Sequence, residues 1–375
     1  MIPFNKPFLT GNETAYIKEA VASGKISGDG IFTKKCHQFF ENRFGFKKCL
    51  LTTSCTDALE MAAILLNISR GDEVIVPSYT FVSTANAFVL RGAKIIFCDS
   101  KTEHPGMDED KIEALITPRT KAIVPVHYAG IACDMDKIMK LADKYGLYVV
   151  EDAAQAIDSY YSFPDGTTKP LGGIGHLAAF SFHETKNVIS GEGGMLVIND
   201  EQFIERAEII REKGTNRSKF FRGEIDKYGW VDIGSSFLPS DIIAAFLFAQ
   251  LEQINIIQER RKELCDNYRI GLEDTKGICF LSVPSYATNN GHMFPIVCES
   301  LDKRSAIIKV LKDNEVLSVF HYLPLHKSEY FKKEYKGEEL PNAEKFADQL
   351  LRLPLYYELQ QKEIQFITML IKSVA

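Results

Sequence analysis

The sequence predicts an α/β fold in which helices cover both faces of a mainly parallel sheet. From about residue 48 to residue 200, short β-rich runs alternate with stretches of helical periodicity, which is typical of a doubly wound sheet. Several of these runs are apolar throughout, as expected for parallel strands buried on both faces. A chain of 375 residues has room for two domains. We expect a large domain over 1–240 and a smaller α+β domain over 241–375, on which the N-terminal residues can pack.

The expected elements follow in chain order. Strands are predicted at 49–52, 73–76, 94–97, 122–126, 147–150 and 195–198, with helices at 56–66, 83–89 and 135–144 between them. A helix over 201–212 precedes a polar, basic loop at 214–223. A long helix over 241–258, with Ser240 as its N-cap, should connect to the small domain. There we expect a strand near 293–297 and helices at 303–312, 343–351 and 363–372.

Composition excludes several classes of protein. The net charge of −6 argues against a nucleic-acid-binding protein, which normally has a basic face. No stretch approaches the roughly 18 apolar residues of a membrane span, and the N-terminus lacks the apolar core of a signal peptide. The eight cysteines are scattered without a C-x-x-C pair, so we expect a reduced, cytoplasmic protein without a disulfide framework or a metal site.

Two segments place an acid and an amine at the ends of predicted strands. Asp152 directly follows the run Val149–Val150–Glu151. Lys186 ends a second run that begins at Ser181. In a doubly wound sheet, ligands bind beyond the carboxyl ends of the strands. An acid there can keep the pyridine nitrogen of pyridoxal phosphate protonated, while a lysine forms a Schiff base with its aldehyde. Taken alone, such a pair is more often a turn aspartate and a solvated lysine.

Other motifs occur in the order that such a site requires. The hydroxyls around Cys55 and Thr56 open an Ala-rich helix, where free N–H groups and the helix dipole favour a phosphate, although an ordinary cap has the same pattern. Phe81 can lie on a planar cofactor ring or belong to the core. Gln155 can donate to the phenolic oxygen of the ring. No G-x-G-x-x-G motif follows the first strand, which disfavours a nicotinamide cofactor. Together these motifs are typical of fold-type-I pyridoxal-phosphate enzymes.

The chain also resembles a known family, the DegT/DnrJ/EryC1/StrS aminotransferases that act on nucleotide-linked keto-sugars. The resemblance extends from Ile2 to the last predicted helix. Its motifs lie at 27–30, 77–81, 125–130, 151–155, 181–187 and 321–326.

The resemblance implies roles for individual residues. Lys186 is the Schiff-base lysine and proton carrier, Asp152 pairs with the pyridine nitrogen, Gln155 contacts the phenolic oxygen and Phe81 stacks on the ring. Cys55, Thr56 and Ser181 hold the phosphate, and His321 is assigned to the substrate site.

The resemblance also implies a homodimer with shared active sites. In many relatives an asparagine of the neighbouring subunit reaches the phosphate. Here Ser236, with a shorter reach, stands at that position, and Leu238 replaces a frequent arginine. The basic loop can contact the neighbour's nucleotide diphosphate through Lys213, Arg217, Lys219 or Arg222, or it can simply be solvated.

Two runs, 77–94 and 206–222, bring the chain closest to family members that aminate carbon 4 of dTDP-4-keto-6-deoxyglucose. The expected reaction uses L-glutamate and yields dTDP-4-amino-4,6-dideoxygalactose and 2-oxoglutarate, for surface glycans such as O-antigen or enterobacterial common antigen. The alternatives are the C4 enzyme that forms the gluco epimer, a C3 aminotransferase, and a regulatory protein that binds the cofactor without turnover. A dehydratase is disfavoured because such relatives carry histidine at the position of Lys186.

Overall fold

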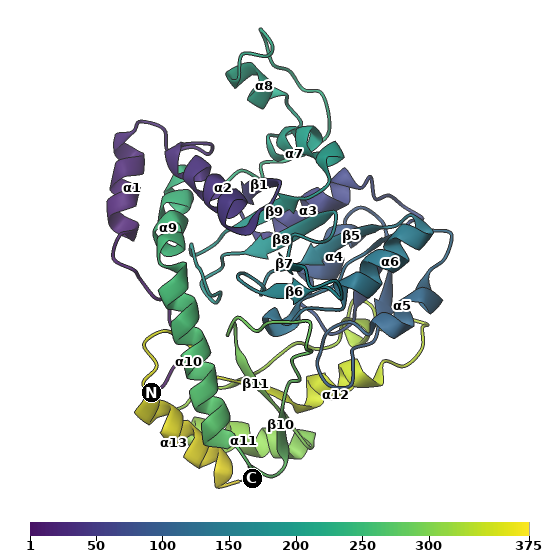
Figure 1. The fold of residues 1–375 in the computed structure, drawn as a ribbon. Helices are drawn as coiled ribbons and strands as arrows, with labels where there is room; N and C mark the ends of the chain where they lie inside the picture. Colours follow the sequence, from purple (N-terminus) through teal and green to yellow (C-terminus); the bar gives the residue numbers. More distant parts are fainter. Residues whose placement is uncertain (375) are drawn as a thin grey trace.

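A seven-stranded sheet forms the centre of the computed structural model, which describes residues 1–374 (Figure 1). The strand order is β1-β9-β8-β5-β4-β2-β3, and β9 runs antiparallel to both of its neighbours while the other strands run parallel to one another. The strands are β1 (Lys48–Thr52), β2 (Glu73–Pro77), β3 (Lys94–Cys98), β4 (Thr120–Ile123), β5 (Tyr148–Asp152), β8 (Leu177–Ser181) and β9 (Gly194–Ile198).

Helices cover both faces of this sheet, and each face has its own apolar core. One core joins the sheet to α3 (Cys55–Leu65), α4 (Ser83–Val89) and α7 (Ile204–Arg211). The other joins it to α2 (Ile31–Phe44), α5 (Glu109–Leu115), α6 (Met135–Tyr145) and α9 (Asp241–Glu252). Because both faces are covered, β2 and β9 are buried along their whole length. The N-terminal α1 (Glu13–Ala22) contacts α9, and the hairpin of β6 (Tyr160–Ser162) and β7 (Thr168–Pro170) lies outside the large sheet.

A second, antiparallel sheet occupies the C-terminal part of the chain. Its order is β10 (Ile278–Phe280), β11 (Phe294–Cys298), β13 (Leu350–Leu353) and β12 (Val319–Phe320). It shares a core with α10 (Ile254–Leu272), α11 (Leu301–Asp313) and α13 (Gln361–Lys372), while α12 (Pro341–Gln349) packs toward the large sheet. Helices α9 and α10 run end to end from one sheet to the other (Figure 1). Ile2 forms a parallel bridge with Val316, so the N-terminus lies against this second sheet.

The observed elements agree with the predicted α/β class, and all six predicted strands of the large sheet are present. Two details differ. The helix expected over 241–258 ends at Glu252, because Gln253 leaves helical geometry and its N–H bonds the Gln250 carbonyl instead of continuing the i to i−4 ladder; Ser240 caps its start as predicted. The expected loop at 214–223 contains the short helix α8 (Arg217–Phe221). Over residues 1–374, no helix has the length and apolar character needed to cross a membrane.

Candidate active site

A cavity of about 640 Å³ lies at the carboxyl ends of β5 and β8, between the large sheet and the second sheet. Its walls include the two strand ends and the segments that follow them, the N-terminus of α3, the segment before α4, His292, and residues of β12, β13 and the segment after β12. The structure brings many of the predicted residues together here. Those that line the cavity are Cys55, Thr56, Phe81, Asp152, Gln155, Ser181, Lys186 and His321.

Asp152 ends strand β5 as a buried carboxylate with two defined partners. Its Oδ2 accepts a hydrogen bond of 2.7 Å from the Thr84 hydroxyl, and its Oδ1 accepts one of 3.2 Å from the Ala154 N–H. Burial nevertheless raises the pKa of Asp152, because two neutral donors do not replace the lost hydration. A cation placed in the cavity would offset this cost. The carboxyl group is therefore suited to hold a protonated ring nitrogen.

Lys186 lies in the turn that follows β8, where its backbone N–H bonds the His183 carbonyl at 2.9 Å. Burial lowers the pKa of its side-chain amine, and the positive charge of Arg352 acts in the same direction, against the opposing effects of Cys55 and Asp152. A lowered pKa favours the neutral amine. That is the form which can attack a carbonyl carbon or accept a proton from carbon.

The N-terminus of α3 offers donors for an anion. Ser54 caps this helix by accepting from the Asp57 N–H at 3.1 Å, and the first intrahelical bond is donated by Ala58. The N–H groups of Cys55 and Thr56 precede that bond and lie at the positive end of the helix dipole. The Thr56 hydroxyl contacts that of Ser83 at 2.8 Å, and Ser181 lines the cavity beside them. These donors can bind a phosphate.

Gln155 is held in one orientation by the backbone. Its Oε1 accepts from the Ala129 N–H at 2.7 Å, so its Nε2 carries the amide protons and donates to the Tyr322 hydroxyl at 3.1 Å. His321 lies beside Tyr322 with the ring centroids 3.6 Å apart, and its Nδ1 is 2.6 Å from the Tyr128 hydroxyl. Burial and the nearby Arg352 hold the pKa of His321 well below its usual range, so this histidine is neutral at physiological pH.

Sequence reasoning missed several side chains that belong to this cavity or its support: Thr84, His292, Tyr322 and Arg352. Thr84 and His292 carry no local sequence signal, because their importance comes from partners that are distant in the chain. Arg352 did have a signal. It is the one charged residue within the apolar run of β13, a position where a charge needs a partner or a ligand.

Five predicted residues do not line the cavity of their own chain, among them Lys219, which pairs with Glu205 at 2.5 Å. Ser236 is exposed and forms a bridge with Glu212, and Lys213 and Arg217 lie near the same Glu212 carboxylate. Arg222 pairs with Glu208 at 2.8 Å and with Glu224 at 2.6 Å. The sequence assigned these residues to the active site of a neighbouring subunit, and that assignment stays a prediction.

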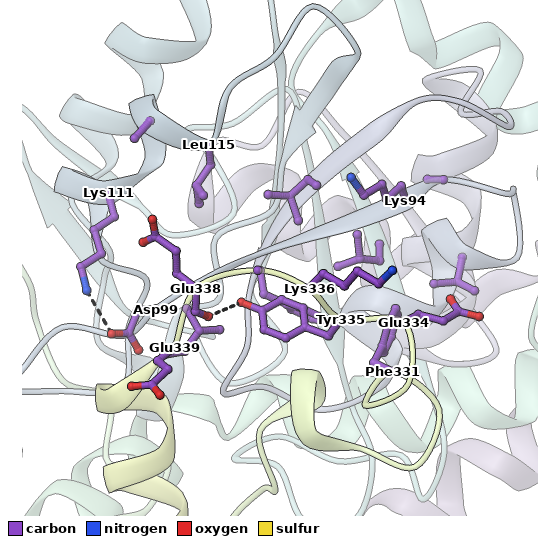
Figure 2. A pocket seen from close by; sticks show the side chains of 18 of the residues that line it. Lys94, Asp99, Lys111, Leu115, Phe331, Glu334, Tyr335, Lys336, Glu338 and Glu339 are labelled. Carbon is purple, nitrogen blue, oxygen red and sulfur yellow. Dashed lines mark hydrogen bonds and ion pairs between the residues drawn. The ribbon is translucent and has the colours of Figure 1, made fainter.

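A larger cavity of about 930 Å³ lies elsewhere, outside the edge strand β3 (Figure 2). Figure 2 shows the Tyr335 hydroxyl bonded to the Glu338 carbonyl and Lys111 paired with Asp99. Both acidic and basic side chains line it, and none of the predicted site residues does. Chemistry, rather than size, therefore identifies the cavity at β5 and β8 as the active site.

The residues of this active-site cavity fit pyridoxal phosphate. A buried acid, a buried amine with a lowered pKa and a helix N-terminus face one cavity, on a doubly wound sheet. This combination defines the class of protein: a pyridoxal-phosphate-dependent enzyme.

Comparison with known proteins gives the particular family. Residues 7–372 match the DegT/DnrJ/EryC1/StrS aminotransferase family, and the chain belongs to it. The chain is 33% identical to the uncharacterized protein MJ1066 of Methanocaldococcus jannaschii and 31% identical to the spore coat polysaccharide biosynthesis protein SpsC of Bacillus subtilis, in each case over 100% of this chain and 97% of the relative.

The fold is shared with solved aminotransferases. The sugar aminotransferase Spr1654 of Streptococcus pneumoniae, described as putative and solved in its PMP-form, superposes with a TM-score of 0.91 at 28% identity, over 100% of this chain and 99% of the other. A PLP-form of the same protein has the same TM-score. The predicted family, the fold-type-I architecture and the cofactor pyridoxal phosphate are thereby confirmed. The protein is an aminotransferase of this family.

Proposed function

We propose that the protein transfers the amino group of L-glutamate to carbon 4 of dTDP-4-keto-6-deoxyglucose in the cytoplasm and forms dTDP-4-amino-4,6-dideoxygalactose. The observation that carries the proposal is the convergence of Lys186, Asp152 and the α3 N-terminus on one cavity. The likeness to a sugar aminotransferase and to a polysaccharide biosynthesis protein supports a sugar acceptor and a role in surface glycan synthesis. We further propose that 1–240 form the cofactor-binding domain and 241–375 the small domain.

The roles of the chain's own residues follow from the geometry. When bound, pyridoxal phosphate supplies an electron sink for the carbon next to the transferred nitrogen. Asp152 holds the ring nitrogen in its protonated state, and its bond from Thr84 keeps the carboxylate oriented. Lys186, favoured as a neutral amine by burial, removes the proton from the α-carbon of the donor and later returns a proton to carbon 4 of the sugar. Phe81, which lines the cavity, would stack on the cofactor ring.

We propose that the active enzyme is a homodimer in which residues 213–236 of one subunit complete the site of the other. This segment carries large apolar side chains in water, with Trp230 83% and Phe221 67% exposed. Apolar patches of this kind usually mark an interface. Helix α8 stands away from the body of the subunit (Figure 1), and the cations of the segment lie outside their own cavity. Ser236, Lys213, Arg217 and Arg222 are then the residues to contact the neighbour's cofactor or nucleotide.

One reaction tests the proposal. The enzyme is incubated with L-glutamate and dTDP-4-keto-6-deoxyglucose, and the product is examined by NMR. We expect an amine at carbon 4 in the axial, galacto orientation, with an equimolar amount of 2-oxoglutarate. An equatorial amine at carbon 4 would identify the gluco-forming enzyme. Amination of a 3-keto substrate instead would identify a C3 aminotransferase, and cofactor binding without turnover would indicate the regulatory alternative. Sedimentation of the enzyme and of Trp230→Ala tests the dimer.

A further inference from the structure

The cavity of about 930 Å³ lies along an open edge of the seven-stranded sheet, and we call it the edge cavity. Residues 94–97 of the edge strand β3 line it. Its other walls come from α4 and the turn after it, from α5, and from the segment 330–340 (Figure 2). Since α4 and α5 belong to the cores on opposite faces of the sheet, the cavity faces the edge of the sheet rather than either face.

Strand β3 presents backbone groups without partners on this side. The Lys94 N–H and the Cys98 carbonyl form hydrogen bonds of 2.9 and 3.0 Å with the residues that flank β2, so both face β2. Alternate residues of a strand bond to opposite sides, and the N–H and C=O groups of Ile95 and Phe97 therefore point away from β2. Within residues 1–374 these four groups have no hydrogen-bond partner. Such an edge is a template for a further strand.

The segment 330–340 borders this edge without pairing with it. The rings of Phe331 and Tyr335 contact Phe97 edge-on, with centroids 5.0 and 5.8 Å apart. In the part of the chain that the structure describes, no hydrogen bond joins the segment to β3. Further apolar side chains line the space between them: Val89, Ala93, Ala114, Leu115 and Leu340. The edge cavity is thus a slot with apolar walls and free backbone groups along one side.

The charges of the edge cavity favour a cationic occupant. Half of its charged side chains are already in ion pairs with each other or with neighbouring residues: Lys94, Asp99, Asp110 and Lys111. The other half form no ion pair within residues 1–374: Glu334, Lys336, Glu338 and Glu339. Three free carboxylates therefore stand against one free ammonium group. Burial and nearby carboxylates, that of Glu338 first among them, raise the pKa of Tyr335, in agreement with this excess of negative charge.

We propose that the edge cavity binds an extended basic peptide segment of a partner protein, which adds an eighth strand to the sheet along β3. The peptide backbone pairs with Ile95 and Phe97, its apolar side chains lie against the aromatic wall, and its lysine or arginine side chains meet the free carboxylates. A small organic cation would satisfy the carboxylates but leave the backbone groups of β3 unpaired. The proposal concerns a site outside the active-site cavity and does not depend on the substrate proposed above.

The probe is a short synthetic peptide of alternating valine and lysine, labelled with fluorescein and capped so that its ends carry no charge. Its fluorescence anisotropy reports binding to the cofactor-loaded enzyme. We expect saturable binding that weakens as salt is added. The counterpart with glutamate in place of lysine should bind about tenfold more weakly, because its charges repel the free carboxylates.

Two variants with the same change of net charge locate the site. Glu338→Lys/Glu339→Lys should bind the basic peptide about tenfold more weakly, because attraction at two positions becomes repulsion. Glu259→Lys/Glu273→Lys, which alters carboxylates that do not line the edge cavity, is the matched control and should bind like wild type. Both variants should keep wild-type transamination, since none of the four residues lines the active-site cavity. Equal binding by the two variants contradicts the site.

Two N-methylated peptides test the strand pairing itself, one methylated on every valine and the other on every lysine. Only one set of N–H groups can face β3, so one form should lose about tenfold in affinity and the other should bind like the parent peptide. Equal affinity of the two forms contradicts strand addition. If spermidine, a cation without peptide groups, binds as tightly as the basic peptide, the edge cavity is a cation site and the proposal is wrong. Failure of the basic peptide to saturate wild type also contradicts it.

Discussion

Thr84 should control the pH range in which the protein binds its cofactor. This residue is fully buried in α4, and its hydroxyl donates to Asp152 at 2.7 Å. An ionised carboxylate can only accept, so the Thr84 oxygen is free to accept in turn from the Thr80 hydroxyl, which is 2.8 Å away. The relay stabilises the ionised form of Asp152. Since only that form can pair with a protonated ring nitrogen, Thr84→Val, which keeps the shape and removes the hydroxyl, should impair cofactor binding at low pH.

The size and sign of the effect follow from this hydrogen bond. A hydrogen bond to a charged group contributes about 1.5–3 kcal/mol. One pH unit corresponds to about 1.36 kcal/mol. In the variant, the loss of cofactor affinity at low pH should therefore begin about one to two pH units higher than in wild type. Burial already raises the pKa of Asp152, and the substitution raises it further, so binding is lost at a higher pH than in wild type. Well above this pKa both proteins should bind equally.

The assay is a titration of the cofactor-free protein with pyridoxal phosphate, followed by protein fluorescence, at a series of pH values. Thr84→Ser keeps the hydroxyl and serves as the control, which should follow wild type. If Thr84→Val binds with an unchanged pH profile, the hydroxyl does not stabilise the carboxylate. If Thr84→Ser shifts as far as Thr84→Val, the effect is one of packing, and the electrostatic reasoning is wrong.

Three further outcomes are expected. Borohydride should fix the cofactor covalently to Lys186 of the wild type, and labelling of another lysine, detected by mass spectrometry of the peptide, would contradict the assignment. Lys186→Ala should bind the coloured cofactor only non-covalently, so that dialysis removes it, and its turnover should fall by several orders of magnitude. Asp152→Asn should stabilise the cofactor-free protein at neutral pH. The pKa of Asp152 is raised in the folded state, so the contribution of its carboxyl group to stability is present at low pH and is lost as pH rises through that pKa. The melting temperatures of the two proteins should therefore converge in acid, and a variant that melts below wild type at neutral pH would argue against this. Gly194→Ala should weaken cofactor binding more than it weakens the fold, because a Cβ at Gly194 would overlap the backbone of Ser54 and Cys55 at the start of α3. The control is Gly229→Ala, whose Cβ would meet no neighbour within 4 Å. If both variants bind the cofactor equally well, the clash at Gly194 is refuted.

The fold could be predicted from the sequence because its information is local. Apolar runs of strand length, separated by helical periodicity, specify a doubly wound sheet, and the ends of those runs mark where ligands bind. Asp152 was found by this rule, since it is the last residue of the predicted strand β5. Lys186 was found from the motif around it, because β8, the strand before it, was not predicted. The break at Gln253 was not found, because one tightened turn between two apolar helices changes no periodicity.

The opposite wall of the active site could not be predicted in this way. Arg352 lies on β13 of the second sheet and His292 lies just before β11, so their place in the cavity of Lys186 depends on how two cores pack together. Thr84 looks like an ordinary helix residue until its partner on β5 is known. For the segment 213–236 the reason is different: its partners are expected on another subunit. The contacts of Ser236 and of the four basic residues, Lys213, Arg217, Lys219 and Arg222, with a neighbouring subunit stay predictions.

Glu151 and Asp152 show why one of two adjacent buried carboxylates is available to a cofactor. Glu151 accepts from the N–H groups of residues 172, 174 and 175 at 2.6–2.8 Å, and from Nε2 of His127 at 2.9 Å. The other nitrogen of His127 accepts from the Cys133 N–H, so Nε2 must carry the proton. Although burial raises the pKa of Glu151, these bonds outweigh it and the pKa is lowered. Glu151 is thus a saturated carboxylate that braces the turn before β8. Asp152, on the other side of the strand, has only two neutral donors and a raised pKa, and therefore keeps the capacity to bind a cation.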